Sequence, residues 1–310
     1  MDQKSRVLVL GATGYIGKYI AKASARLGHP TFVLVRPASV EGPLNSSKKE
    51  LLNSFTAAGI TILHGDIGNH ESIIAALKQV DVVISGVGGR QVLDQLNLIK
   101  AIKEVGHIQR FIPSEFGSDV ERVSNIKPIQ DLYKPKAEIR KAIRDAGIPH
   151  TFVNSNGFLV YFLSIIFKEN LQVPPSGKIT IYGDGNVKVY MVDENDVATI
   201  IIKAIDDPRT LNKQLVYRPK RNTLSMNEIV EIFEQKTGHN LEKTYIPGPV
   251  MRAQLDGKGM LMILQYSSLT YSTAVLGDHL FELGPGDVLA TDLYPDFEFR
   301  TVSSVLDTML

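Results

Sequence analysis

Three glycines near the N-terminus have a spacing that suits an anion. They form Gly-x-x-Gly-x-x-Gly in "GATGYIG", between an apolar run and a helical pattern. The first glycine allows a tight turn, the second lets a pyrophosphate approach the backbone, and the third lets helix and strand pack closely. The following helix N-terminus adds free N–H groups and a positive dipole. The pattern predicts a dinucleotide-binding loop, whose residues are Gly11, Thr13, Gly14, Tyr15, Ile16 and Gly17.

Charged residues after the next apolar runs bear on which dinucleotide binds. NAD-preferring folds of this kind place a carboxylate after the second strand, on the ribose 2′-hydroxyl. Here Arg36 ends "TFVLVR", and a guanidinium suits a 2′-phosphate, over which Lys48 or Lys49 could close. These residues predict NADP(H); the alternative is that Arg36 is only a solvated strand end. Asp66 in "HGDI" either lies near the adenine or caps the next helix.

The tyrosine–lysine pair common in short-chain dehydrogenases of this fold is absent from the sequence. That pair needs lysine four residues after tyrosine, and none of the 11 tyrosines has it. Tyr133 comes nearest, but Pro135 stands between it and Lys136. We therefore expect another group to handle the proton.

Lys136 is the candidate for this group. In "YKPKAEIRKAIRDAG", Pro135 suits the first helical position, which places Lys136 in the first turn. The positive end of the helix and partial burial would each lower the pKa of its ammonium below ~10.4, toward the range useful for general acid–base catalysis. The alternative is a surface lysine among Lys134, Arg140 and Lys141.

Short apolar runs alternate with helical patterns through the first half of the chain. The predicted strands are residues 6–10, 31–35, 60–64, 80–85, 110–113 and 150–154. The predicted helices are residues 16–27, 48–58, 70–78, 92–105 and 136–146. Buried strands separated by helices favour an α/β fold with a doubly wound parallel sheet in a Rossmann-like layout.

The pattern changes after about residue 157. We predict an NADP-binding domain over residues 1–157, to which about 186–206 return, and a smaller, interleaved α/β substrate-binding domain over 158–310. In the second part, "KITIYGDGNVKVYMV" predicts two strands around a Gly-Asp-Gly turn. A helix from about Asn195 has Asp193 or Asn195 as its candidate cap.

A second helix of this part is predicted in "LSMNEIVEIFEQKTG". Ser225 or Asn227 would cap its N-terminus, and Gly238 would end it.

Composition argues against several classes of partner and site. A formal net charge of +1 gives no reason to expect nucleic acid or an acidic membrane as a partner. The chain has no cysteine, which suits a reducing cytoplasm, and its 7 histidines show no ligand spacing, so we expect no structural zinc. The apolar run "FLVYFLSIIF" (158–167) is about half a bilayer span. We interpret it as core or pocket wall, and predict a cytoplasmic protein.

Taken together, several stretches resemble the plant isoflavone reductase-like family of NmrA-type atypical short-chain dehydrogenases. They are "GATGYIG", "LGHPTFVLVRP", "NLIKAIKEVG", "RFIPSEFGSDV", "KAEIRKAI", "GIPHTFVNSNGF", "IYGDGNVK" and "DDPRTLNK". The family includes phenylcoumaran benzylic ether, pinoresinol–lariciresinol, isoflavone and leucoanthocyanidin reductases, and eugenol and isoeugenol synthases. The resemblance implies NADPH as cofactor, a small phenolic substrate and a homodimer.

The resemblance also implies roles for particular residues. The family's catalytic lysine falls on Lys136, and its phosphate-clamping arginine and lysine fall on Arg36 and Lys48. Its "PSEFG" loop, here residues 113–117, would lie by the nicotinamide, and its "NxF" segment would shape the same pocket. Without the resemblance, Glu115 would be a surface or structural carboxylate. The further residues that we assign to the cofactor site are Gln91, Ser114, Phe116, Asn156 and Phe158.

The reaction that the resemblance implies uses the substrate's own phenol. Lys136 would take the proton of a para-phenol, a benzylic ether or an ester would open, and NADPH would deliver hydride to the resulting quinone methide. One lysine would then suffice without a tyrosine. Phe158, Tyr161, Phe162 and Met260–Leu264 would form the pocket wall.

Departures from the family pattern bear on the substrate. Ser118 stands where leucoanthocyanidin reductases tend to have histidine, whereas "GVGGRQVLDQ" is similar to them and "SNGF" is similar to benzylic ether reductases. Residues 246–290 depart most. We favour a phenylcoumaran benzylic ether reductase over the other enzymes of the family. The alternative of another class is an NmrA-like regulator that senses NADP(H), and Lys136 within "KAEIR" favours the enzyme.

Overall fold

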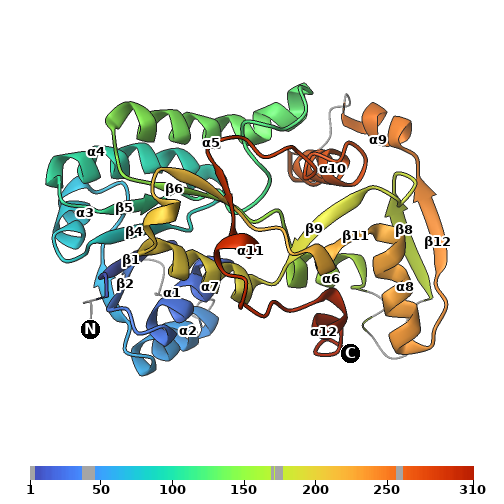
Figure 1. The fold of residues 1–310 in the computed structure, drawn as a ribbon, viewed down its shortest axis with the longest axis horizontal. Helices are drawn as coiled ribbons and strands as arrows, with labels where there is room; N and C mark the ends of the chain where they lie inside the picture. The colour runs from blue at the N-terminus through green and yellow to red at the C-terminus, as the bar shows by residue number, and fades with distance from the viewer. Residues whose placement is uncertain (1–3, 37–45, 169–170, 172–176, 256–260) are drawn as a thin grey trace.

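The computed structural model describes residues 4–36, 46–168, 171, 177–255 and 261–310. They form a larger lobe around a parallel sheet and a smaller lobe beside it (Figure 1). The predicted α/β class is confirmed.

The larger lobe is built on five parallel strands in the order β3-β2-β1-β4-β5. These strands are β1 (Val7–Leu10), β2 (Thr31–Val35), β3 (Thr61–His64), β4 (Val82–Ser85) and β5 (Arg110–Ile112). The direction of winding reverses between β1 and β4, where doubly wound sheets bind their ligands at the carboxyl ends of the strands. The predicted Rossmann-like layout is confirmed.

Strands from later in the chain extend this sheet beyond β5. They are β6 (Thr151–Asn154), β10 (Lys213–Val216) and β13 (Asp287–Leu289), all parallel. A parallel bridge joins Phe111 to His150, and Phe111 N donates to Pro149 O over 2.8 Å. Two strands from the second half of the sequence therefore complete the larger lobe. The domain limits at residues 157 and 158 stay a prediction.

Helices cover both faces of the sheet. Val7 and Val9 of β1 face one core, and Leu8 and Leu10 face the other, because successive side chains of a strand point to opposite faces. All four are buried, as a parallel strand between two helical layers requires. The helices on the first face are α1 (Gly17–Arg26), α2 (Ser46–Ala57) and α7 (Glu194–Ile205). Those on the second are α3 (His70–Leu77), α4 (Gln95–Val105) and α5 (Lys127–Ala146).

The smaller lobe has short strands around its own apolar core. Its strands are β7 (Gly157–Phe158), β8 (Lys178–Tyr182), β9 (Lys188–Val192), β11 (Thr223–Ser225) and β12 (Glu242–Ile246). Helices α6 (Leu159–Ile166), α8 (Met226–Thr237) and α12 (Val302–Leu306) pack around this core. The remaining described helices are α9 (Gly248–Leu255), α10 (Leu261–Ala274), α11 (Ala290–Leu293), η3 (Gly89–Asp94), η4 (Pro208–Thr210) and η5 (Lys220–Asn222).

The predicted strands around Gly-Asp-Gly exist, but they do not pair with each other. β8 pairs with β12 in parallel, and β9 pairs with β11 and β7. The two predicted strands are therefore confirmed, but the turn does not join them as a hairpin. Each strand takes a partner that is distant in sequence, and this choice is made by packing rather than by the turn.

The predicted helix ends are confirmed at two places. Asp193 caps α7 by accepting from Asn195 N over 2.8 Å. Ser225 and Glu228 form a capping box at the start of α8, and Gly238 ends this helix with a φ of 70°.

The predicted start of α5 is wrong. This helix begins at Lys127, with Pro128 in its first turn, and Pro135 lies inside it. A proline inside a helix removes one backbone hydrogen bond and usually marks a boundary, which is why the sequence favoured a start at this point. Packing of α5 against α4 and α10 retains the longer helix.

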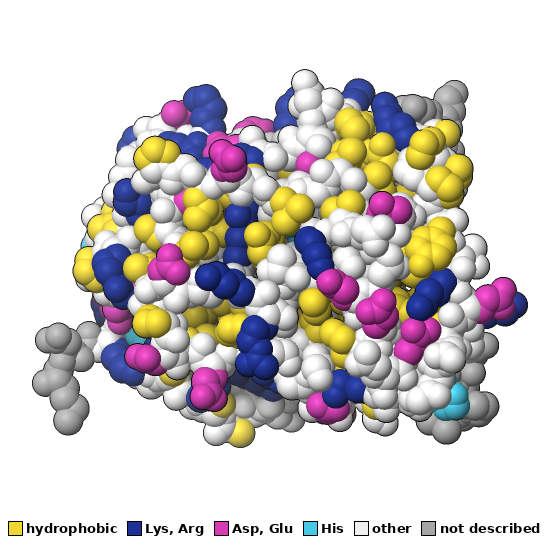
Figure 2. All heavy atoms as spheres, turned by 45° about the vertical axis from the view of Figure 1, so that its right-hand side comes forward, with side chains coloured by type: hydrophobic (Ala, Val, Ile, Leu, Met, Phe, Trp, Pro, Cys, Tyr) yellow, Lys and Arg dark blue, Asp and Glu magenta, His cyan; other side chains and the backbone are white. Residues whose placement is uncertain are grey.

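Charged side chains of both signs are interspersed over the face shown in Figure 2, with apolar side chains gathered at the upper right. Among the helices that the structure describes, each is too short or too polar to cross a lipid bilayer.

Candidate active site

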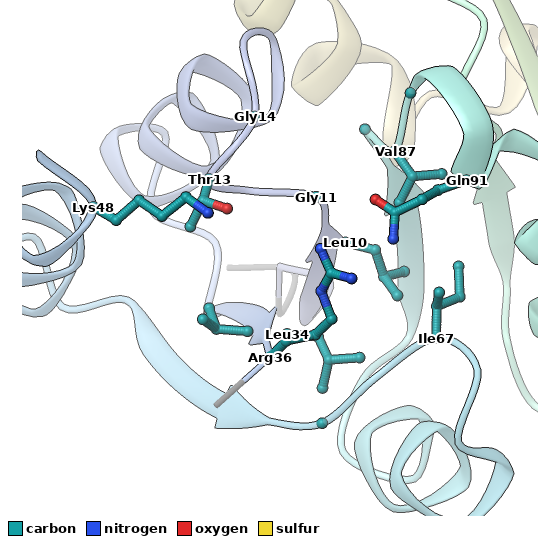
Figure 3. Close-up of a pocket in the computed structure, with 14 residues that line it drawn as sticks. Leu10, Gly11, Thr13, Gly14, Leu34, Arg36, Lys48, Ile67, Val87 and Gln91 are labelled. Atoms are coloured by element: carbon teal, nitrogen blue, oxygen red, sulfur yellow. The ribbon is translucent and has the colours of Figure 1, made fainter. Parts of the chain in front are cut away.

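A cleft opens at the carboxyl ends of β1, β2 and β4 (Figure 3). The residues that line it are Leu10, Gly11, Thr13, Gly14, Leu34, Val35, Arg36, Lys48, Gly65, Ile67, Gly86, Val87, Gly88 and Gln91. Six predicted cofactor residues therefore share this cleft. Its lining combines glycine backbone, apolar strand ends and two cationic side chains.

The glycine loop packs directly against the end of β4. Gly11 has a φ of 70°, and a Cβ atom there would lie 2.7 Å from the carbonyl group of Gly86. A Cβ atom at Gly17 would overlap the carbonyl oxygen of Gly11. Both positions therefore require glycine: the first for its backbone conformation and close approach, the second for the tight entry into α1.

Arg36 and Lys48 reach this cleft from different elements. Arg36 follows β2 and Lys48 lies on α2, and both side chains extend toward the glycine loop (Figure 3). Arg36 Nε lies 3.8 Å from Asp66 Oδ2. Lys49 is not part of the lining, so the structure brings Lys48 rather than Lys49 to the cleft.

Asp66 does not cap the next helix, so that alternative is wrong. Its Oδ1 accepts from Gly68 N over 2.7 Å, and Asn69 caps α3 by accepting from Ser72 N over 2.9 Å. Asp66 instead closes a turn and lies beside Arg36.

The loop after β5 is tied to the wall of the cleft. The Ser114 hydroxyl donates to the carbonyl of Val87, a lining residue. Ser114 N donates to Gln95 Oε1 over 2.9 Å. These bonds hold the "PSEFG" loop against the cleft.

Two predicted site residues have backbone conformations that side chains rarely adopt. Phe116 has a φ of 34° and Asn156 a φ of 55°, and both are buried. Asn156 N donates to Gly117 O over 3.0 Å, which joins the two segments. Such conformations cost energy and gather at functional sites, most notably for a bulky residue such as phenylalanine.

Phe158 extends this junction to the glycine loop. Its ring centroid lies 5.9 Å from that of Tyr15. Neither residue lines the cleft, and Ile16 is buried in the core of the larger lobe. The cleft, the Tyr15–Phe158 contact and the "PSEFG" loop therefore form one continuous region.

Lys136 contacts the same loop from α5. It is partly buried, and its Nζ donates to the backbone carbonyl of Glu115 over 2.8 Å. Burial lowers the pKa of Lys136 below its ordinary value, the charge of Glu115 opposes this, and Arg140 lowers the pKa further. The surface alternative for Lys136 is wrong. So is the expected effect of a helix N-terminus, because Lys136 lies well inside α5.

Arg140, one helical turn beyond Lys136, fixes the side chain of Glu115. Its Nε and Nη2 donate to the two carboxylate oxygens over 2.7 and 2.6 Å. Its Nη1 lies 3.4 Å from Asp119 and 3.0 Å from Glu121. Arg140 and Glu115 are both fully buried, so a bidentate ion pair holds the loop whose carbonyl accepts from Lys136.

Tyr133 does not pair with Lys136, although both lie on α5. Its hydroxyl donates to Ser118 Oγ over 3.0 Å, and burial raises the pKa of Tyr133 to about 12. His279 Nε2 lies 3.2 Å from the same Ser118 Oγ. Burial, reinforced by Arg218, lowers the pKa of His279 to about 3, so this imidazole is neutral.

Several contributors were missed from the sequence. Gly86 and Gly88 line the cleft, and the signal was the glycine cluster in "GVGG" directly after β4. Arg140 was read as a surface neighbour of Lys136, although its spacing of one helical turn placed both on one helix face. Of the predicted pocket wall Met260–Leu264, Met260 and the side chains that follow lie outside what the structure describes. Across the described residues, no cluster of His, Asp and Glu is placed to hold a metal ion.

The model of the NmrA-like family matches residues 3–306. The chain belongs to the NmrA-like family. This NmrA-like chain is 49% identical to phenylcoumaran benzylic ether reductase IRL1 of Ginkgo biloba, over 98% of each chain. The predicted resemblance to isoflavone reductase-like proteins is confirmed.

Solved structures give the same relationship. The NmrA-like chain has a TM-score of 0.90 and 42% identity to a structure from a study of pinoresinol–lariciresinol and phenylcoumaran benzylic ether reductases, with both chains fully covered. It has a TM-score of 0.89 and 36% identity to the leucoanthocyanidin reductase–NADPH complex from Vitis vinifera, over 98% of this chain and 99% of that one.

Proposed function

We propose that this NmrA-like protein is an NADPH-dependent reductase that opens a benzylic ether in a phenolic substrate. The observation that carries the proposal is the partly buried amine of Lys136, held by the Glu115 carbonyl on a loop that also contacts the cofactor cleft. The relative from Ginkgo biloba is named for this reaction. NADPH is named in a complex of a related leucoanthocyanidin reductase.

The cleft has the donor set that NADPH needs. Gly11 and Gly17 allow the tight packing of the loop, because a Cβ atom at either would collide with backbone, and Gly14 would let a pyrophosphate approach the backbone. Arg36 and Lys48 supply two positive charges for a 2′-phosphate, at the end of β2 where an NAD-specific protein carries a carboxylate. When bound, NADPH supplies the hydride. Ser114, Phe116, Asn156 and Phe158 would hold the segments that border its reactive end.

Lys136 handles the phenolic proton. Its lowered pKa increases the share of neutral amine, which accepts the proton of a para-phenol. The benzylic C–O bond then breaks, with its electron pair going to the ether oxygen, and the carbon that loses this oxygen accepts the hydride. Lys136 returns its proton to the phenolate, and a proton from water neutralises the departed oxygen.

The test is turnover of a substrate panel with either NADPH or NADH. The panel contains a phenylcoumaran, pinoresinol, an isoflavone, a leucoanthocyanidin and a coniferyl ester. We expect NADPH consumption with the phenylcoumaran, and a preference for NADPH over NADH. Lys136→Ala should lower kcat/KM by roughly 10²–10⁴-fold, the usual contribution of a general acid–base group.

Lys134→Ala is the matched control, because Lys134 is exposed on the same helix two residues away. It should leave turnover unchanged. If only another member of the panel is turned over, the protein is still an NADPH-dependent reductase, but the proposed substrate class is wrong. Binding of NADPH without any turnover would instead support the NADP(H)-sensing regulator and overturn the proposal. A cytoplasmic location stays a prediction from composition, and a homodimer stays a prediction from the resemblance.

A further inference from the structure

Glu194 is a fully buried carboxylate that lies between the two lobes. It is the first residue of α7, and its Oε1 and Oε2 accept hydrogen bonds from three groups. Tyr15 Oη donates to Oε1 over 2.5 Å, Tyr161 N to Oε1 over 2.9 Å and Val160 N to Oε2 over 3.1 Å. A buried carboxylate is costly unless several donors reach it, so these three bonds decide whether it is tolerated.

Helix α6 depends on Glu194 for its N-terminus. Its N-cap residue is Phe158, which has no side-chain oxygen and makes no capping bond. The amides of Val160 and Tyr161 lie in the first turn, where an α-helix has no partner of its own to offer. Glu194 supplies that partner from a position more than 30 residues later in the chain. It can do so because β7 pairs with β9, which places Phe158 opposite Val192.

The third bond connects this cap to the glycine loop. Tyr15 belongs to "GATGYIG", and its hydroxyl shares Glu194 Oε1 with the amide of Tyr161. The Tyr15 ring also contacts the rings of Phe158 and Tyr161, with centroids 5.9 and 5.3 Å apart. One carboxylate oxygen is thus held both by the predicted dinucleotide loop and by the helix that carries the predicted pocket wall.

We propose that Glu194 is a positioning residue that couples the dinucleotide loop to α6. When NADP(H) orders the loop, Tyr15 is held against Glu194, and Glu194 in turn holds the first turn of α6 in place. Tyr161, which is half exposed, and Phe158 are thereby set for the substrate side. This inference rests on the proposed function, because it requires NADP(H) at residues 11–17.

The test is hydrogen–deuterium exchange of the full-length protein with and without NADP⁺, followed at residues 11–17 and at residues 159–166. In the unmodified protein, NADP⁺ should slow exchange at both segments, and at 159–166 by roughly tenfold, the order that one hydrogen bond to a charged group supplies. In Tyr15→Phe, NADP⁺ should still slow exchange at 11–17 but no longer at 159–166. Glu194→Gln should give fast exchange at 159–166 with or without NADP⁺.

Tyr294→Phe is the matched control, because Tyr294 Oη donates to Asp207 Oδ2 over 3.0 Å at a place remote from the loop. Tyr294→Phe also removes a hydrogen bond from a tyrosine hydroxyl to a carboxylate. In this variant NADP⁺ should still slow exchange at residues 11–17 and at residues 159–166. If Tyr15→Phe also keeps the response at 159–166, Glu194 is only structural and the inference is overturned. If NADP⁺ protects neither segment in the unmodified protein, the proposed function fails, and the inference with it.

Discussion

The cofactor cleft and the Lys136 cluster border the same loop but are built in opposite ways. The shape of the cleft depends on backbone packing, because the glycine loop lies directly against the end of β4, and apolar strand ends and two cationic side chains complete its lining. The cluster is made of charged side chains, with Lys136 and Arg140 on α5 and Glu115 on the loop after β5. The cleft depends on local backbone conformation, whereas the cluster depends on buried ion pairs. Substitutions in the two regions should therefore have different effects.

The difference shows what each region tolerates. Glycine in the cleft is required because a Cβ atom would overlap neighbouring backbone. A larger residue there should therefore displace the loop. In the cluster, a substitution should lower the free energy of unfolding, since a buried charge that loses its partner destabilises the folded state. We therefore expect changes in the Lys136 cluster to act on global stability, and changes in the cleft to act on ligand affinity.

The largest effect is expected from Arg140→Leu. This change leaves the buried carboxylate of Glu115 without its two donors, so we expect a loss of roughly 3–5 kcal/mol in the free energy of unfolding. Urea denaturation measures it. Arg144→Leu is the control: Arg144 lies one turn further on α5 and contacts the ring of Phe152 as Arg140 does, but its ion pair with Glu121 is half exposed. Arg144→Leu should lower the free energy of unfolding by less than about 1 kcal/mol. Equal losses in the two variants would contradict the expectation that burial of the ion pair sets the size of the effect.

Gly11→Ala should act on ligand affinity more than on stability. Alanine at a φ of 70° is strained and its Cβ would press on Gly86, which displaces the loop. We expect NADPH binding to weaken by roughly tenfold or more, measured by fluorescence titration.

Gly59→Ala is the control for this effect. Gly59 has a φ of 74°, but a Cβ atom there would meet open space. Gly59→Ala should lower the free energy of unfolding by roughly 1–2 kcal/mol, because alanine is strained in the same left-handed conformation, while NADPH affinity stays unchanged. Weakened NADPH binding in this variant would show that backbone strain, and not the contact with Gly86, controls affinity.

The smallest expected change in activity is a shift in the pH dependence of Glu115→Gln, measured under conditions where the variant is folded; Arg140 keeps Asp119 and Glu121 as partners. The negative charge of Glu115 raises the pKa of Lys136, so removing it should lower that pKa further. Activity requires the neutral amine and is lost as pH falls, so the acid limb of the kcat/KM profile should move to lower pH. Glu121→Gln, which removes another partner of Arg140, should leave the limb in place. A shift to higher pH in Glu115→Gln would contradict the assignment of Lys136 as the group that titrates.

Much of the larger lobe could be predicted from periodicity alone. The β1, β2 and β4 runs are continuous and apolar, because both faces of a parallel strand are buried, and helices separate them. The caps at Asp193 and Ser225 were also accessible, since capping depends on residues within one turn. The course of α5 through Pro135 was not, because packing outweighed a local preference for a helix start.

The candidate site also has parts that could be predicted from the sequence and parts that could not. By itself, the sequence determined the glycine loop and the arginine after β2, because residue type and near spacing carry that information, whereas the choice of Lys136 rested on the family resemblance and stays a prediction. Only the tertiary structure decided that β8 and β9 take other partners, that Arg140 locks Glu115, and that Glu194 caps a distant helix. The physical reason is burial: a strand edge or a charge taken out of water needs a specific partner, and that partner is supplied by the packed fold from anywhere in the chain.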